Sequence, residues 1–554
     1  MDAPSCSSAD HNPRTNEVTN QNSKKRSHDN DSTNENAKKR SRVDNSSNQN
    51  CAKDNSDKLK TKPTCKYGEK CYRKNENHWK EFSHPKQEQD QPDNKGQELE
   101  KEKFEKSRLP FYMTTVHGID DCFNVPNIAL SISDILNLDA EKLLESCQFN
   151  YMIDIPWLVN KYPSKSRAKP LLIVHGSEGK EKMNLQSDAM SLKNIDLLQA
   201  KLPIPYGTHH TKMMLLLYDH GLRVVVHTAN LIEQDWNQKS QGIWISPLFK
   251  KSQDGNTTNT KQDHFKDDLL EYMNAYGSAK LSKWIQKLQS FDMSNAKARI
   301  IGSVPGRHGG QSLLKWGHMR LRKLLSNHGP SASHVTADWS VIGQFSSIGS
   351  LGTEPNKWLT SEWLQSFSQC RKNSTGNALQ RNTKAKLNLV FPTMENVRHS
   401  LEGYSAGGSL PFSVENAMKQ RWMRPFLCQW RSTRIGRSLA SPHIKSYTRL
   451  SPRCDEAAWF CVTSANLSKA AWGSLEKNGT QLMIRSYEIG VLVTPEIMGS
   501  NEDFLQLSSG CEGRDLRLPF DVPLTNYTAE DKPWVWNIRY TKEDSHGKLW
   551  NPNF

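Results

Sequence analysis

Two histidines, each followed two positions later by a lysine, are the residues of this sequence best suited to chemistry. They form the pairs His210 with Lys212 and His443 with Lys445. A neutral imidazole can attack phosphorus and form a covalent intermediate, while a second, protonated imidazole donates a proton to the leaving oxygen. Two lysines add positive charge for the non-bridging oxygens, where negative charge builds in the transition state. The two pairs therefore indicate phosphoryl chemistry. They do not resemble a catalytic metal cluster.

The two pairs belong to an internal repeat. Asn230 follows the first histidine by 20 residues and Asn466 follows the second by 23, and each asparagine stands in a Ser/Thr-Ala-Asn-Leu sequence. Apolar runs at 213–218, 222–226 and 457–462 predict strands between each histidine and its asparagine. The asparagine amides add neutral donors for a phosphate or hold the lysines. Repetition of the whole pattern makes a functional origin far more probable than chance.

Strand geometry explains the spacing within each pair. Residues i and i+2 of a strand project from one face, so a strand carrying His210 and Lys212 directs both side chains to the same side. His209 then lies on the opposite face, and we expect it to be structural. The sequence thus predicts that each H-x-K motif lies within a strand.

Composition narrows the class of protein. Of the net charge of +15, the larger part falls after residue 108, which favours an anionic partner such as nucleic acid. The eleven cysteines show no framework spacing outside one cluster, and we find neither a signal peptide nor a run of about 20 apolar residues. These features predict an intracellular protein with reduced thiols and no membrane partner, and we expect a monomer.

The first sixty residues differ from the rest. Residues 1–60 are rich in Asn, Ser, Asp and Lys and poor in aliphatic side chains, which predicts a disordered tail. Its basic clusters 24–26 and 38–42 are separated by eleven residues. This arrangement resembles a bipartite nuclear localisation signal and predicts a nuclear protein, with the cytoplasm as a further location.

A small metal module is predicted at residues 61–86, followed by a charged linker at 87–108. Two cysteines and two histidines supply the four ligands of a tetrahedral structural zinc site: Cys65, Cys71, His78 and His84. With the intervening Gly68, Asn75 and Pro85, the segment resembles the poly(ADP-ribose)-binding zinc finger. That resemblance implies that Tyr72 and Arg73 contact the polymer, by adenine stacking and phosphate pairing.

The repeated H-x-K…N motifs resemble those of the phospholipase D superfamily, and the surrounding sequence narrows the resemblance to the tyrosyl-DNA phosphodiesterase family. It extends from about residue 109 to the C-terminus. The segments that carry it are 205–214, 241–244, 344–352, 464–473, 478–481, 486–488 and 532–537. The implied fold is α/β, with two similar domains (mixed sheets flanked by helices) at 109–297 and 298–554. A pseudo-twofold axis relates them, and the active site lies between them.

The resemblance also assigns roles. His210 is the expected nucleophile, and His443 is the expected general acid of the first step and base of the second. The expected phosphate ligands are Lys212, Lys445, Asn230 and Asn466. Gln241 and Glu488 are expected to orient the two histidines, although the sequence does not say which serves which. Ser347, Ser350, Ser468 and Tyr206 match positions that contact DNA.

The implied substrate is a DNA 3′ end, single- or double-stranded, blocked by a phosphotyrosyl link such as a topoisomerase I-derived peptide, and the implied product is a 3′-phosphate. Zinc is expected in the finger alone, with no catalytic metal. Two alternatives remain open from the sequence. One is a poly(ADP-ribose)-binding adaptor with an inert catalytic half, and the other is a lipid phosphodiesterase.

Overall fold

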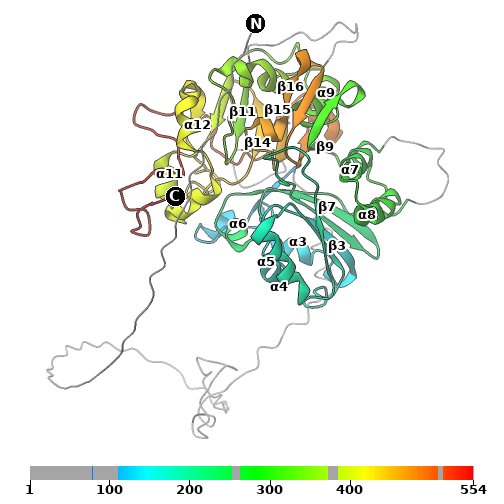
Figure 1. The fold of residues 1–554 in the computed structure, drawn as a ribbon. Helices are drawn as coiled ribbons and strands as arrows, with labels where there is room; N and C mark the ends of the chain where they lie inside the picture. Colours follow the sequence, from blue (N-terminus) through cyan, green and yellow to red (C-terminus); the bar gives the residue numbers. More distant parts are fainter. Residues whose placement is uncertain (1–77, 79–109, 253–262, 372–384, 509–515, 553–554) are drawn as a thin grey trace, which may run out of the picture. The chain divides into compact units, whose positions relative to one another are not determined.

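The computed structural model describes residue 78 and residues 110–252, 263–371, 385–508 and 516–552. Two large sheets organise these residues, the first formed by strands β1–β8 and the second by β9, β11–β15, β18 and β19 (Figure 1). The predicted tail, the linker and the finger lie outside the described residues, apart from His78. No helix of the described ranges is both long enough and apolar enough to cross a membrane.

The strand orders show that the two sheets are copies of one design. The first runs β2-β1-β8-β7-β6-β3-β4-β5, and the second runs β13-β12-β11-β14-β15-β18-β9, with β19 beside β15. When the order of the second sheet is reversed, its strands β9-β18-β15-β14-β11-β12-β13 correspond one to one to β1-β8-β7-β6-β3-β4-β5 of the first. The pattern of parallel and antiparallel neighbours is also the same, with β3-β4-β5 and β11-β12-β13 parallel and the remaining corresponding pairs antiparallel. The predicted fold class is therefore confirmed.

The first sheet contains β1 (Tyr112–Thr114), β2 (Ala129–Leu130), β3 (Leu143–Phe149), β4 (Leu171–His175), β5 (Ile195–Gln199), β6 (Met213–Tyr218), β7 (Gly221–His227) and β8 (Gly242–Ile245). The second contains β9 (Arg299–Ser303), β11 (Ser340–Gln344), β12 (Leu387–Val390), β13 (Leu427–Cys428), β14 (Ser446–Leu450), β15 (Glu456–Thr463), β18 (Glu488–Val493) and β19 (Leu505–Gln506). A third, small sheet contains β10 (Gly306–Gly309), β16 (Ser474–Glu476) and β17 (Gln481–Ile484).

The α-helices within residues 110–552, as far as these are described, are α3 (Ile132–Asn137), α4 (Ile155–Lys161), α5 (Gly179–Met190), α6 (Glu233–Asn237), α7 (His264–Asn274), α8 (Ala279–Gln289), α9 (Gly317–His328), α10 (Leu364–Phe367), α11 (Met394–Arg398), α12 (Val414–Lys419), α13 (Lys469–Trp472) and α14 (Pro495–Met498). β9 begins at Arg299, next to the predicted division between residues 297 and 298, which itself stays a prediction.

Strand β6 shows how the apolar runs are used. All six of its residues are buried, because both faces of the sheet are covered. Met213, Leu215 and Leu217 belong to the core between the two sheets. Met214, Leu216 and Tyr218 alternate with them and pack with residues of α3, α4 and α5 on the other face. A continuous apolar run is the sequence signature of such a doubly covered strand.

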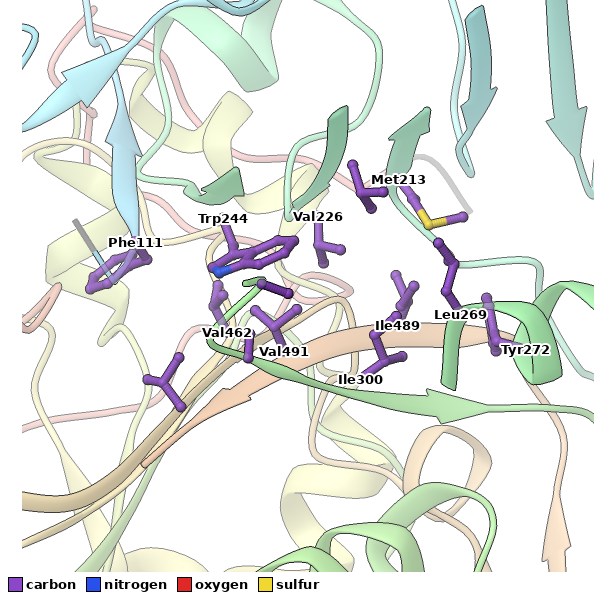
Figure 2. Packing of buried hydrophobic residues seen from close by; sticks show 14 of the residues in the cluster. Phe111, Met213, Val226, Trp244, Leu269, Tyr272, Ile300, Val462, Ile489 and Val491 are labelled. Carbon is purple, nitrogen blue, oxygen red and sulfur yellow. The ribbon is translucent and has the colours of Figure 1, made fainter. Parts of the chain in front are cut away.

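One core joins the two sheets. Its residues come from β6, β7 and β8 of the first sheet and from β9, β15 and β18 of the second. Figure 2 shows Trp244 and Val226 facing Val462 and Val491 across this layer, with Ile489 and Ile300 farther along it. Face-to-face packing of this kind fixes the two repeats against each other, so the connections that lead into their active motifs come together.

Candidate active site at the junction of the repeats

The H-x-K motifs do not lie within strands, so that prediction was wrong. His210 and Lys212 precede β6, and His443 and Lys445 precede β14. At these points the backbone pairs with the other repeat. The His210 N–H donates to Tyr487 O over 2.9 Å, and the Ile444 N–H donates to Ser240 O over 2.8 Å. The lysine carbonyls still accept hydrogen bonds from their own repeat, Lys212 O from the His227 N–H over 3.1 Å and Lys445 O from the Thr463 N–H over 3.0 Å. Only the part of each motif before the lysine therefore crosses into the junction between the two domains.

His210 is held by a carboxylate of the second repeat. Its Nδ1 lies 2.9 Å from Glu488 Oε2, the same oxygen that accepts a hydrogen bond from the Ser464 hydroxyl. A carboxylate only accepts, so His210 Nδ1 carries the proton and Nε2 keeps its lone pair. That arrangement leaves Nε2 able to act as a nucleophile.

His443 is held by the first repeat in a related way. Its Nδ1 lies 2.9 Å from Gln241 Nε2 and 3.2 Å from Gln241 Oε1. The Thr228 hydroxyl donates to Gln241 Oε1 over 2.7 Å, as Ser464 does to Glu488. The question that the sequence left open is thereby answered, because Gln241 contacts His443 and Glu488 contacts His210. Each contact crosses between the repeats.

Asp235 is a further partner of His443. Its Oδ2 lies 3.2 Å from His443 Nδ1 and accepts the backbone N–H of Asn230 over 2.7 Å. Asp235 is completely buried on the short helix α6. Although burial raises it, the pKa of this carboxyl is held below its ordinary value by His443 and Lys239. Asp235 was missed at the sequence level, where an Asp in a short polar helix carries no distinguishing signal.

The two motif lysines are completely buried, and each acts electrostatically on the histidine of the other motif. Lys212 Nζ donates to the carbonyl oxygen of His210, and Lys445 Nζ donates to that of His443. Burial lowers the pKa of Lys212 to about 8, partly offset by the charges of Glu488 and Asp235. The pKa of Lys445 is lowered well below its usual range by burial and by the charge of Lys212. A bound anion favours the charged form of both lysines, so the site is suited to an anionic ligand.

Burial also lowers the pKa values of the two histidines. It lowers the pKa of His210, with Glu488 opposing the change and Lys212 adding to it. It lowers the pKa of His443 to about 3, helped by Lys445 and opposed by Asp235. Both imidazoles are therefore neutral at pH 7 without substrate. A bound phosphodiester brings a negative charge, which favours a protonated His443.

The two asparagines differ in their surroundings. Asn466 Oδ1 accepts backbone N–H groups from Ser346 and Ser347, each over 3.0 Å. Its oxygen is thereby used, and its amide nitrogen is left to donate. Asn230 is buried, and its backbone N–H donates to Asp235 Oδ2. Both asparagines directly follow the strand next to their motif strand, β7 or β15.

The predicted DNA-contact serines come together on one side of the site. Ile348 forms a bridge with Leu467, and Gly349 N–H donates to Leu467 O over 3.0 Å, which places the 347–350 loop against Ser468. Ser468 caps α13 by accepting the Ala471 N–H. Ser347 donates to Pro411 O over 2.7 Å, and Ser350 is exposed.

Two aromatic residues flank the first motif. Tyr206 is 90% exposed and has a φ of 61°, a backbone conformation that costs a non-glycine residue energy and often marks a functional position. Tyr151 was not predicted. Its ring packs edge-on against that of His210 at 5.4 Å, and Lys212 Nζ lies 5.7 Å from its centre. Only the fold brings Tyr151, at the end of β3, beside the motif.

His209 is structural, as expected. It is buried, with Nδ1 3.1 Å from Asn150 O and Nε2 3.0 Å from the Tyr276 hydroxyl. A cavity of about 160 Å³ in the second repeat, lined by Arg434, Cys454 and Phe520 among others, contains none of the predicted site residues. No cluster of three or more potential metal ligands occurs among the residues that the structure describes. Of the predicted zinc ligands, Cys65, Cys71 and His84 fall outside those residues, as do Tyr72 and Arg73.

Comparison with known proteins agrees with this geometry. Residues 110–528 match the family model described as tyrosyl-DNA phosphodiesterase, and residues 62–87 match that of the PBZ domain. The chain is 34% identical over 494 residues to tyrosyl-DNA phosphodiesterase 1 of Arabidopsis thaliana, covering 80% of this chain and 77% of the relative. It is 37% identical over 418 residues to the Drosophila melanogaster protein of the same name, covering 74% and 70%.

Among solved structures, yeast tyrosyl-DNA phosphodiesterase superposes with a TM-score of 0.58 at 21% identity. The match covers 77% of this chain and 98% of the yeast chain. At that identity, the match supports the two-domain fold.

Proposed function

The chain belongs to the tyrosyl-DNA phosphodiesterase family and is a phosphodiesterase of DNA repair, and we propose that it acts through a covalent phosphohistidine on His210. The observation that carries the proposal is the reciprocal arrangement of the two histidines. Each turns Nδ1 to a partner from the other repeat, and each is influenced by the buried lysine of the other motif. This arrangement also argues against an adaptor with an inert catalytic half.

In the proposed first step, His210 Nε2 attacks the phosphorus of a 3′-phosphotyrosyl link. The bond from phosphorus to the tyrosyl oxygen breaks, and His443 protonates that oxygen. Lys212 and Lys445 stabilise the charge on the non-bridging oxygens, and the amide of Asn466 adds a neutral donor. Glu488 stabilises the positive charge that His210 acquires on forming the bond.

In the proposed second step, His443, now neutral, removes a proton from water, and the water oxygen attacks phosphorus. The bond between phosphorus and His210 breaks, which releases a 3′-phosphate and restores the enzyme. The same residue acts as acid and then as base, because the two steps are near mirror images across the phosphorus.

We extend the proposal to the DNA and to the N-terminal region. Ser347, Ser350 and Ser468 present small hydroxyls and backbone groups to the DNA strand, and Tyr206 stacks on a base. The PBZ match supports a finger in which Cys65, Cys71, His78 and His84 hold structural zinc and Tyr72 and Arg73 bind poly(ADP-ribose). The basic clusters of the tail direct the protein to the nucleus, and a trapped topoisomerase I peptide is the proposed substrate.

Metal removal tests the division between the two modules. In EDTA, cleavage of a 3′-phosphotyrosyl oligonucleotide is expected to continue at its full rate, because histidines and lysines supply all the chemistry. Binding of poly(ADP-ribose) by the same sample is expected to be lost under strong zinc chelation, since so short a segment depends on its metal for folding. A gel assay and a filter-binding assay measure the two activities. Cleavage that stops in EDTA and returns with magnesium would contradict the mechanism, and a chain that binds the polymer but never cleaves would be an adaptor.

Removal of the carboxylate behind the nucleophile is a second test. Glu488→Gln is expected to slow formation of the covalent intermediate by about 10- to 100-fold, the range found for groups that orient metal-bound histidines. Because Glu488 raises the pKa of His210, its loss lowers that pKa further. The acid limb of the first-step pH profile therefore moves to lower pH. Glu362→Gln, which removes a half-buried carboxylate elsewhere in the second repeat, is the control and should leave rate and profile unchanged.

A further inference from the structure

A chain of buried charges extends away from His443. Asp235 Oδ1 lies 3.7 Å from Lys239 Nζ, and Lys239 Nζ donates to Glu402 Oε1 over 2.7 Å. The side chains of Asp235, Lys239 and Glu402 are at most 6% exposed. His443 and Glu402 belong to the second repeat, whereas Asp235 and Lys239 belong to the first, so the chain crosses the junction twice. Buried ion pairs of this kind are strongly coupled, because little solvent screens them.

Within the part of the protein that the structure describes, this series of buried charges has no counterpart at the other histidine, so it breaks the symmetry of the repeats. Asp235 stands five residues after Asn230, and the residue five positions after Asn466 is Ala471. Ala471 is buried but cannot contact His210 with a charge. The nucleophile is instead paired directly with Glu488, which has no comparable lysine and second carboxylate behind it among the contacts of the described residues. The extended chain is therefore specific to the histidine that must both give and accept a proton.

The tautomers explain why His443 needs a carboxylate. If Gln241 Nε2 donates to His443 Nδ1, the ring proton resides on Nε2, and the ring cannot take a proton from water there. Asp235 cannot donate, so it requires a proton on Nδ1. That choice leaves Nε2 free as the base of the second step, and it stabilises the imidazolium needed for the first.

We propose that Asp235, Lys239 and Glu402 form a relay of positioning residues that sets the tautomer and the proton affinity of His443, an inference that rests on the proposed function. Asp235 supports the imidazolium. Lys239 limits that support by attracting the same carboxylate, and Glu402 offsets Lys239. Proton affinity at the general acid is thus balanced by alternating charges rather than by one partner.

Other charged groups also face the relay. Lys445 and Lys212 act on His443 from the two H-x-K motifs, and both oppose its protonation. Asp235 faces His443 and Lys239, and Glu402 faces Lys239 and Asp235. A bound phosphodiester is expected to neutralise the two motif lysines, whereas Lys239 is only 3% exposed and already donates to Glu402. The relay therefore remains as an adjustable influence on His443 in the enzyme–substrate complex.

The test compares leaving groups. Single-turnover release is measured from DNA carrying a 3′-phosphotyrosyl group and from DNA carrying a 3′-p-nitrophenyl phosphodiester, whose phenol is more acidic and departs without a proton. Asp235→Asn is expected to slow tyrosyl release by about 10²-fold, within the range for loss of general acid catalysis, and p-nitrophenol release by less than about 10-fold. Asp268→Asn, which removes a carboxylate that pairs with Arg299 and Arg320, is the control. It should leave the ratio of the two rates unchanged.

Substitutions of Glu402 and Lys239 are expected to shift the pKa of His443 in opposite directions. First-step activity falls as pH rises through the pKa of His443 in the complex. Glu402→Gln leaves Lys239 uncompensated, so this alkaline limb should move to lower pH, with a loss of about 2- to 30-fold at neutral pH. Lys239→Met frees Asp235 to support the imidazolium, so the limb should move to higher pH. A glutamine at position 402 can still accept the hydrogen bond from Lys239, so the Glu402→Gln variant is expected to fold. It therefore tests the relay even if Asp235→Asn fails to fold.

The outcomes separate the relay from the underlying function. Equal losses on both substrates for Asp235→Asn, or an unmoved alkaline limb for Glu402→Gln, would overturn the relay while the wild-type enzyme still cleaved both. Failure of the wild-type enzyme to release either leaving group would instead overturn the proposed function.

Discussion

Replacement of His210 by alanine is expected to reduce turnover by more than about 10⁴-fold, as removal of a covalent nucleophile does in other hydrolases. Within this motif, His210 Nε2 is the imidazole nitrogen left free to form the phosphorus–nitrogen bond, since Nδ1 contacts Glu488 and both ring nitrogens of His209 are hydrogen-bonded. Steady-state cleavage of a 3′-phosphotyrosyl oligonucleotide measures the effect.

The fold should survive this change. Glu488 loses one partner but keeps the Ser464 hydroxyl, so the cost in the free energy of unfolding is about 1–3 kcal/mol. A thermal melt checks that the variant is folded. His334→Ala removes an exposed histidine and should match the wild type in both assays. Near-normal turnover by His210→Ala would show that the nucleophile is another residue.

Replacement of His443 by alanine or arginine is expected to trap the enzyme on DNA. In the first step His443 protonates a phenolate, whose conjugate acid has a pKa near 10 and which departs partly unaided. In the second step it must activate water, a poor nucleophile without a base. Loss of a general acid–base group costs about 10²–10⁴-fold, and the larger share should fall on the second step. The covalent adduct between His210 and the 3′-phosphate therefore accumulates.

The trapped adduct has properties that identify it. It should migrate as a slow band on a denaturing gel and should be labile to acid, as phosphohistidine is. The double variant that also carries His210→Ala should give no band, which serves as the control. Slow but measurable cleavage without any band would mean that water attacks phosphorus directly and that His443 is not the base of the second step.

The active motifs could be recognised from sequence because they repeat. His210 with Lys212 and Asn230, and the matching set at His443, stand out as two copies of one pattern. The apolar run over β6 likewise predicted a strand, since its hydrophobicity is a property of adjacent residues. The α/β fold class, by contrast, was implied by the family resemblance, and the order of two cysteines and two histidines predicted the zinc site.

Only the tertiary structure shows that each repeat supplies the side chain that contacts the histidine of the other repeat. Gln241 contacts His443 and Glu488 contacts His210, over separations of 202 and 278 residues, and no spacing along the chain encodes either pair. The H-x-K residues lie ahead of their strands, and the backbone before each lysine pairs across the junction. Asp235 became visible as a partner of His443 only through the same docking. The sequence by itself predicted the candidate reactive groups and the strands β6, β7 and β15 that lie between each histidine and its asparagine. Packing of the two sheets over one core determined which group orients which, because that depends on the relative placement of two domains.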